Sequence, residues 1–208
     1  MFEHAEDLVA KSGHVWHGLA IGWRNDICQN IHILDSSCDR IVGVKLELST
    51  RSLLLLSFYA PTSGRDEDFL ESISNLSEYV QRNSSQGDQI IIGADSNCST
   101  KSSSRRQEAW RILCESLELK EHKPTFPSFH HHNGTSDSFL DLFAASSTLS
   151  MQEIIQYCTL ESPLNLSSHD PIETTINIQL DEADKESKFK NTYSDFRRKK
   201  ITWDVKIP

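Results

Sequence analysis

The sequence predicts an α/β (α+β) fold, a layered sandwich of two β-sheets flanked by helices, and three observations support this prediction. Short apolar runs of strand length alternate with two longer segments whose apolar residues recur at helical spacing. Two of the strand-like runs, 53–59 and 89–93, are apolar almost throughout, which is typical of strands covered on both faces. The chain has 208 residues, which is enough for one domain with a buried core.

Each element follows from its local pattern. The segment 41–48 alternates apolar residues with others, as a half-buried strand does. Apolar side chains recur at helical spacing in 66–82 and in 104–119, and Asp66 is placed to cap the first of these helices. Further strands are expected at 18–24, 140–143, 154–160 and 172–178.

Charge divides the chain into three regions. We predict an acidic N-terminal segment at 1–13, a domain at 14–180, and a linker with a basic tail at 181–208. From residue 185 onward, eight basic and three acidic residues give a charge of +5. Because the whole chain has a net charge of -9, the residues before 185 carry a net charge of -14. This acidic body excludes a generally basic, histone-like binder of nucleic acid.

Membrane and secretory functions are also excluded. No apolar run approaches the length of a membrane span, and the N-terminus has no secretory signal. The five cysteines are odd in number and show no CxxC spacing, which argues against a disulfide framework or a structural zinc site. We therefore expect an intracellular monomer that is not secreted.

Polar side chains gather just after the predicted strands. Tyr59, Asp95, Asn97, Asp141 and His169 all lie at such positions, and groups at strand ends can meet in one crevice of a layered domain. Carboxylates, an amide and an imidazole suit metal-assisted hydrolysis of a phosphoester. They can activate water, orient the phosphate and donate hydrogen bonds to its oxygens. Each residue alone would more often be a turn, core or loop residue, so the prediction depends on the set.

Four motifs in order resemble those of the endonuclease/exonuclease/phosphatase superfamily, which has the deoxyribonuclease-I-like fold. Within it, the likeness is to the apurinic-type endonuclease domain of non-LTR (LINE-type) retrotransposons. HGLAIGWRNDI at 17–27 resembles the "GG-aI-vr" strand, LLLLSFYAPTSG at 53–64 the "vYaP" strand, and IIIGADSN at 90–97 the "GDFN" motif. The segment 124–146 followed by SSHDPI resembles the "T…S-x-I-D" and "SDHxPI" motifs.

The resemblance implies a catalytic role for each residue of the set. Tyr59 would contact the scissile phosphate, and Asp95 would position or activate the water with Asn97 beside it. Asp141 would pair with His169 and keep it protonated against the phosphoryl group. The implied cofactor is Mg²⁺ or Mn²⁺, the implied partner is the phosphate backbone of DNA, and the lineage suggests the nucleus.

Further residues would bind substrate. By resemblance, Ser138 would touch the phosphate. Lys101, Arg105 and Arg106 directly follow the Asp95 motif and could contact the DNA backbone beside the site. A basic tail ending in Trp203 could bind phosphates, although a solvated linker is the commoner use of such a segment. Three consecutive histidines at 130–132 are expected in an exposed loop.

Two departures from the family pattern affect the metal site. The family opens with a strand bearing Asn and then a "QET" motif, whose Glu is the principal metal ligand, and nothing before His17 matches these. We therefore expect a domain truncated at its N-terminus that lacks the first strand or strands. The "SDH" motif has Ser168 in place of its Asp, so Asp170 is the candidate substitute ligand.

Three functions remain open at this point. The first is a Mg²⁺-dependent endonuclease that nicks DNA. The second is a catalytically inactive retroelement remnant that acts as a binding module or has no function. The third is another phosphoesterase of the same superfamily.

Overall fold

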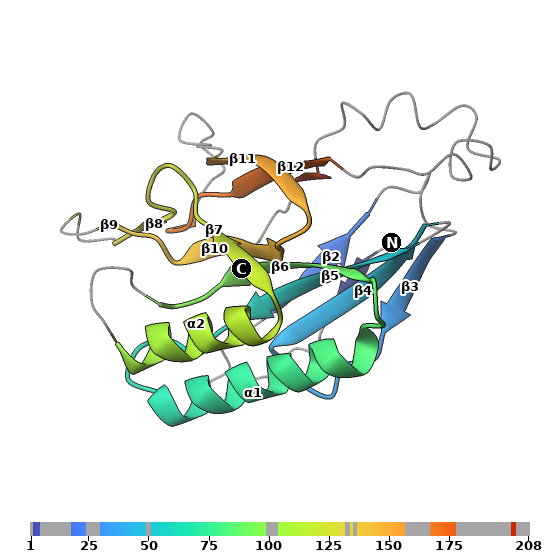
Figure 1. Ribbon diagram of the computed structural model, residues 1–208. Coiled ribbons are helices and arrows are strands. Elements are labelled where there is room, and N and C mark those ends of the chain that lie inside the picture. Colours follow the sequence, from blue (N-terminus) through green and yellow to red (C-terminus); the bar gives the residue numbers. More distant parts are fainter. Residues whose placement is uncertain are drawn as a thin grey trace.

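The main sheet of the molecule has six strands and lies in the middle of the fold (Figure 1). The computed structural model describes residues 2–4, 18–23, 30–48, 51–98, 104–131, 134, 137–156, 167–177 and 201–202. In spatial order the main sheet consists of β3 (Ile31–Leu34), β4 (Ile41–Glu47), β5 (Ser52–Tyr59), β6 (Gln89–Asp95), β10 (Asp141–Ser146) and β7 (Leu119–His122). Neighbouring strands are antiparallel except β5 and β6, which are parallel.

Two helices cover one face of this sheet (Figure 1). They are α1 (Asp66–Asn83) and α2 (Arg105–Ser116). Alternate residues of β5 point to opposite faces, so Leu54, Leu56 and Phe58 pack beneath the helices. This arrangement explains why the strand is apolar almost throughout, as the sequence predicted.

Shorter strands form a second layer over the opposite face. β1 (Phe2–His4) pairs with β2 (Ala20–Gly22), and a separate sheet is made of β11 (Ser150–Gln156), β12 (Ile172–Asn177) and β13 (Ile201–Thr202). Ile21 of β2 and Ile172 of β12 are buried against Val44, Leu53 and Phe143 of the main sheet. A small hairpin of β8 (Phe129–His130) and β9 (Asp137–Ser138) stands beside these layers.

The predicted sandwich of two sheet layers flanked by helices is confirmed. Both predicted helices form, and each predicted strand segment overlaps a strand, although 24, 157–160 and 178 lie outside the described residues. The prediction that Asp66 caps α1 is wrong. The N-cap is Arg65, and Asp66 is the first helical residue, where its carboxylate pairs with Arg106 instead.

Several strands were not predicted. β1 lies in the segment assigned to 1–13, where Glu3 stands opposite Ile21 of β2. β13 lies in the predicted tail, where Ile201 stands opposite Thr174 of β12. Both pairings add strands to the second layer from outside residues 14–180. Among the described residues, no helix has the length and hydropathy needed to cross a membrane.

Candidate active site

The site is built on a row of residues at one end of the main sheet. Tyr59 is the last residue of β5 and stands beside Asp95, the last residue of β6, in the parallel register. Asp95 in turn stands opposite Asp141, the first residue of β10. Residues paired across neighbouring strands point to the same face, and here that face is turned toward the second layer. The register therefore brings together residues that are 36 and 46 positions apart in the chain.

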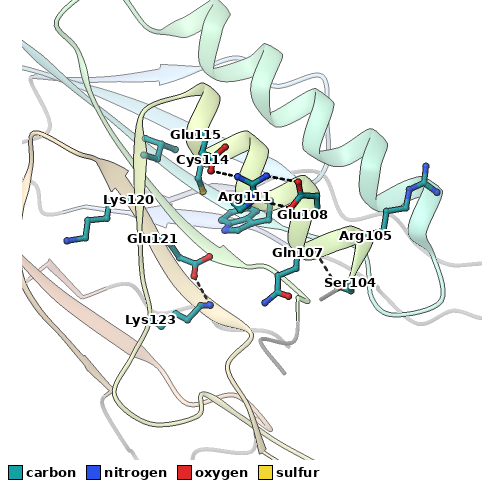
Figure 2. A pocket seen from close by; sticks show the side chains of 12 residues that line it. Ser104, Arg105, Gln107, Glu108, Arg111, Cys114, Glu115, Lys120, Glu121 and Lys123 are labelled. Carbon is teal, nitrogen blue, oxygen red and sulfur yellow. Dashed lines mark hydrogen bonds and ion pairs between the residues drawn. The ribbon is translucent and has the colours of Figure 1, made fainter. Parts of the chain in front are cut away.

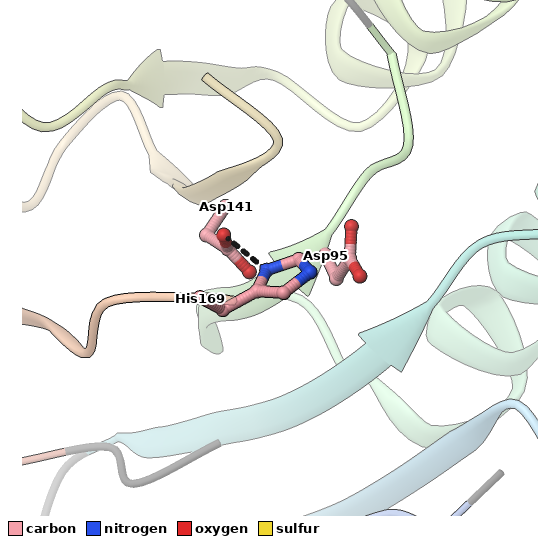
Figure 3. A group of neighbouring side chains, drawn as sticks. All are labelled: Asp95, Asp141 and His169. Carbon is pink, nitrogen blue, oxygen red and sulfur yellow. Dashed lines mark hydrogen bonds and ion pairs between the residues drawn. The ribbon is translucent and has the colours of Figure 1, made fainter. Parts of the chain in front are cut away.

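His169 completes the group from the loop before β12 (Figure 3). Its Nδ1 lies 2.9 Å from Oδ2 of Asp141, and its ring lies between the carboxylates of Asp141 and Asp95. One potential ligand atom from each of the three residues lies within 4.8 Å of the others. Asp95 and Asp141 are only 3% and 4% exposed. Two buried carboxylates and an imidazole at this spacing could hold a metal ion.

Burial and charge shift the acid–base behaviour of the group. The pKa of Asp95 is raised from 3.8 to about 7. Burial raises it most and the charge of Asp141 also raises it, whereas the charge of His169 and the hydrogen bond from Asn97 lower it. Burial by itself lowers the pKa of His169. The hydrogen bond and charge of Asp141 outweigh this effect, together with the charges of Asp95 and Asp170, and the net shift is upward. The arrangement therefore favours an Asp95 that exchanges a proton near neutral pH beside a protonated His169.

Asn97 joins the ends of two strands next to this group. Its backbone N–H donates to Oδ1 of Asp95 at 3.2 Å, and its Nδ2 donates to the carbonyl of Ala60 at 2.8 Å. It adopts a left-handed backbone with φ of 45°, which asparagine tolerates better than most residues. Burial raises the pKa of the nearby Tyr59, as does the charge of Asp95, whereas Arg40 and a hydrogen bond with Asn97 lower it. Tyr59 and Asn97 thus both lie at the carboxylate of Asp95.

The β8–β9 hairpin supports the histidine side of the site. The ring of Phe129 packs edge-on against His169 with 4.9 Å between centroids, and Ser138 stands opposite Phe129 in β9. Ser128, which precedes β8, accepts a hydrogen bond from the backbone N–H of Asp141 through its hydroxyl. The hairpin therefore pairs Ser138 with the residue that packs on His169, and the contact of Ser138 with phosphate stays a prediction.

Asp170, the predicted metal ligand, has a different neighbour. Its Oδ2 lies 2.8 Å from Nε2 of His130, whose Nδ1 lies 3.0 Å from Oδ1 of Asp137. Hydrogen bonds to both carboxylates raise the pKa of His130. Asp170 thus ties the loop before β12 to the hairpin, and its role as a metal ligand stays a prediction. Of the exposed loop expected at 130–132, His130 belongs instead to β8, His131 follows that strand and is half-buried, and His132 lies outside the described residues.

The three predicted cationic contacts differ in their surroundings. Arg105 is exposed, and its guanidinium lies 3.5 Å from Glu67. Arg106 is 7% exposed, and its guanidinium donates to Asp66, to the carbonyl of Pro61 and to the carbonyl of Thr62 at 2.6–2.7 Å. The predicted DNA contact of Arg106 is therefore corrected, because all three of its nitrogens are used within the fold. Lys101 and Trp203 lie outside the described residues.

A groove of about 720 Å³ lies away from this site, between α2 and β7 (Figure 2). Its cations are largely neutralised by neighbouring acids. Arg111 pairs with Glu108 and Glu115, and Lys123 pairs with Glu121. Such a mixed surface gives no concentrated positive charge for a phosphate backbone.

Comparisons with known proteins agree with this fold and site. A family model described as endonuclease-reverse transcriptase matches residues 53–173, which include Tyr59, Asp95, Asn97, Asp141 and His169. A search among curated proteins by sequence gives no match.

Three solved structures share the fold. The endonuclease domain of TRAS1, a telomere-specific non-LTR retrotransposon, is 17% identical with a TM-score of 0.62, over 86% of this chain and 81% of that one. An endonuclease/exonuclease/phosphatase family protein from Bacteroides thetaiotaomicron is 13% identical with a TM-score of 0.56, over 86% and 76%. The 3' phosphatase NExo from Neisseria, bound to a product DNA hairpin, is 11% identical with a TM-score of 0.57, over 72% and 71%. The chain therefore belongs to the endonuclease-reverse transcriptase family and has the deoxyribonuclease-I-like fold of the endonuclease/exonuclease/phosphatase superfamily.

Proposed function

We propose that this chain is a divalent-metal-dependent phosphodiesterase that nicks DNA by attack of an activated water on a backbone phosphate. The observation that carries the proposal is the buried group of Asp95, Asp141 and His169, with ligand atoms within 4.8 Å of one another. Membership of the endonuclease-reverse transcriptase family supports this reaction, and the DNA hairpin bound to the similarly folded NExo supports this class of substrate. Chromosomal DNA as substrate would place the protein in the nucleus.

The protein groups divide the work according to their protonation. Asp95 has a pKa of about 7, so at neutral pH it can accept a proton from the attacking water. Asn97 holds that carboxylate through its backbone N–H. Asp141 orients His169 and favours its protonated form, which can donate a hydrogen bond to a phosphoryl oxygen. The hydroxyl of Tyr59 would donate to the same phosphate.

The donor set suits a hard divalent cation. Mg²⁺ and Mn²⁺ prefer oxygen ligands, which acidic side chains at the site would supply. The imidazole of His169 is already engaged with Asp141 through Nδ1, which leaves carboxylates as the principal ligands. When bound, the cation would neutralise negative charge that develops on the phosphate during attack.

We further propose that Glu3 supplies the acidic ligand for which the sequence showed no motif. In the family the Glu-bearing "QET" motif precedes the "GG-aI-vr" strand, which β2 resembles. In this chain β1 precedes β2, pairs with it antiparallel and contains Glu3, opposite Ile21. β2 itself packs on the face of the main sheet to which Tyr59, Asp95 and Asp141 point.

Nicking of supercoiled plasmid by the purified chain tests the proposal. Mg²⁺- or Mn²⁺-dependent nicking is expected, with loss in EDTA. Asp95→Asn and His169→Gln should each lower the rate by about 10²–10⁴-fold, the range for a group that transfers a proton or donates to the phosphate. His32→Gln, on the opposite edge strand β3 and three strands away from β6, is the matched control and should keep the wild-type rate. A folded wild-type protein that nicks with neither metal would refute the proposal and leave an inactive remnant.

A further inference from the structure

The row of site residues extends one strand further, to Arg40, which precedes β4. The backbone N–H of Tyr59 donates to the carbonyl of Arg40 at 3.1 Å, and Nη1 of Arg40 donates to the carbonyl of Tyr59 at 3.3 Å. The guanidinium carbon lies 5.6 Å from the centroid of the Tyr59 ring, within the range of a cation–π contact. Its positive charge also lowers the pKa of Tyr59. Arg40 is therefore held against the residue expected to touch the scissile phosphate.

The charge of Arg40 is not neutralised by an acid in the described part of the chain. Four other arginines there form ion pairs: Arg65 with Asp68, Arg105 with Glu67, Arg106 with Asp66, and Arg111 with Glu108 and Glu115. Arg82, like Arg40, pairs with no carboxylate of the described residues, but it lies on α1, away from the site. Within the described ranges, no carboxylate pairs with Arg40, and only one of its guanidinium N–H groups has a hydrogen-bond partner. In a chain of net charge -9, a partly exposed guanidinium left in this state suits an anionic ligand.

We propose that Arg40 binds the phosphate next to the scissile one, so that the site takes a nucleic-acid strand rather than a small phosphodiester. This inference rests on the proposed function. Arg40 lies two strands away from Asp95, and strands are roughly 4.8 Å apart, so their backbones are about 10 Å apart. Tyr59 lies between them. When one phosphate binds at Asp95 and Tyr59, Arg40 is therefore left to contact the next phosphate along the nucleic-acid strand.

Two substrates and three variants test this inference. The substrates are a duplex oligonucleotide and bis(p-nitrophenyl) phosphate, a diester that has no second phosphate. Arg40→Met keeps the apolar stem and removes the charge, and Arg40→Lys keeps the charge. Arg82→Met is the matched control, because Arg82 also lies over a tyrosine ring, 5.5 Å from the centroid of Tyr79, and donates to a carbonyl. Arg82 belongs to α1, on the opposite side of the sheet.

Arg40→Met should raise the KM for the duplex about tenfold, with kcat within about twofold of wild type. The slope of log binding constant against log salt should fall in magnitude by about 1. Arg40→Lys should restore the wild-type salt slope, and Arg82→Met should leave KM, kcat and the slope unchanged. The rate of hydrolysis of the small diester should be the same in Arg40→Met as in the wild type. Equal thermal stability of the variants checks that the fold is retained.

The inference is overturned if Arg40→Met binds the duplex with the wild-type slope. It is also overturned if Arg40→Met slows hydrolysis of the small diester as severely as cleavage of the duplex, since Arg40 would then act only by holding Tyr59. A wild-type protein that binds the duplex but cleaves neither substrate refutes the proposed function alone, and the salt slope still decides the role of Arg40. A wild-type protein that does not bind the duplex refutes both.

Discussion

Removal of the ionisable group at Asp95 should stabilise the folded protein above neutral pH. Asp95 is 3% exposed, and its pKa rises from 3.8 to about 7 on folding, mainly because burial penalises the charged form. Between these values the folded protein binds a proton that the unfolded chain does not, so the free energy of unfolding falls as pH rises. A shift of about 3 units at 1.36 kcal/mol each gives an upper bound of roughly 4 kcal/mol, present at low pH and lost by about pH 8. Asp95→Asn keeps the shape of the side chain but cannot ionise.

Urea unfolding at half-unit steps from pH 5 to pH 8, in EDTA, measures this effect. The wild type should lose stability relative to Asp95→Asn by a few kcal/mol as pH rises from 5, and the loss should level off above about pH 7. Because Asp95 and His169 interact, the pH at which the loss levels off belongs to the pair. Asp35→Asn removes an exposed carboxylate outside the site and is the control. A stability difference that does not change with pH, or that changes in favour of the wild type as pH rises, would refute the reasoning.

Two further predictions concern Arg106 and Glu3. Arg106→Met should lower the free energy of unfolding by about 2–4 kcal/mol, because it removes charge-assisted hydrogen bonds to a carboxylate and two carbonyls. The exposed Arg105→Met should change it by less than about 0.5 kcal/mol in the same urea titration, and equal losses in the two variants would contradict the buried role. Glu3→Gln should reduce the rise in Tm that Mg²⁺ gives the wild type, whereas Glu6→Gln should preserve it. An unchanged rise in Glu3→Gln would remove Glu3 from the metal site.

Elements with a strong local pattern were predictable from the sequence. The spacing of apolar residues in α1 and the apolar runs of β5 and β6 reflect burial of those same residues. The edge strands β3 and β7 were missed. β3 exposes the apolar Ile33 beside His32, and β7 has the largely polar sequence LKEH, so neither edge strand shows the apolar alternation of a half-buried strand. β1, β8 and β9 have two or three residues each and depend on their pairing partners.

The site residues were likewise predictable where a motif marked them and were misjudged or missed elsewhere. Asp95, Asp141 and His169 were proposed from ordered motifs, and the structure brings them into one group. Arg106 was assigned to the surface because it follows the Asp95 motif in the chain, but one turn of α2 directs it into the fold toward Pro61 and Thr62. Arg40 was missed because a turn residue before a strand has no motif of its own.

The sequence by itself determined the family, the layered α/β architecture and the polar residues that end the strands. These depend on periodicity and on residue order, and both are local properties of the chain. Only the tertiary structure decided which of those residues share a site. The register of β4, β5, β6 and β10 places Arg40 beside Tyr59, Asp95 and Asp141, and it directs Asp170 to His130. Strand register depends on the burial of a whole sheet face between two layers, and no single segment of the sequence encodes that packing.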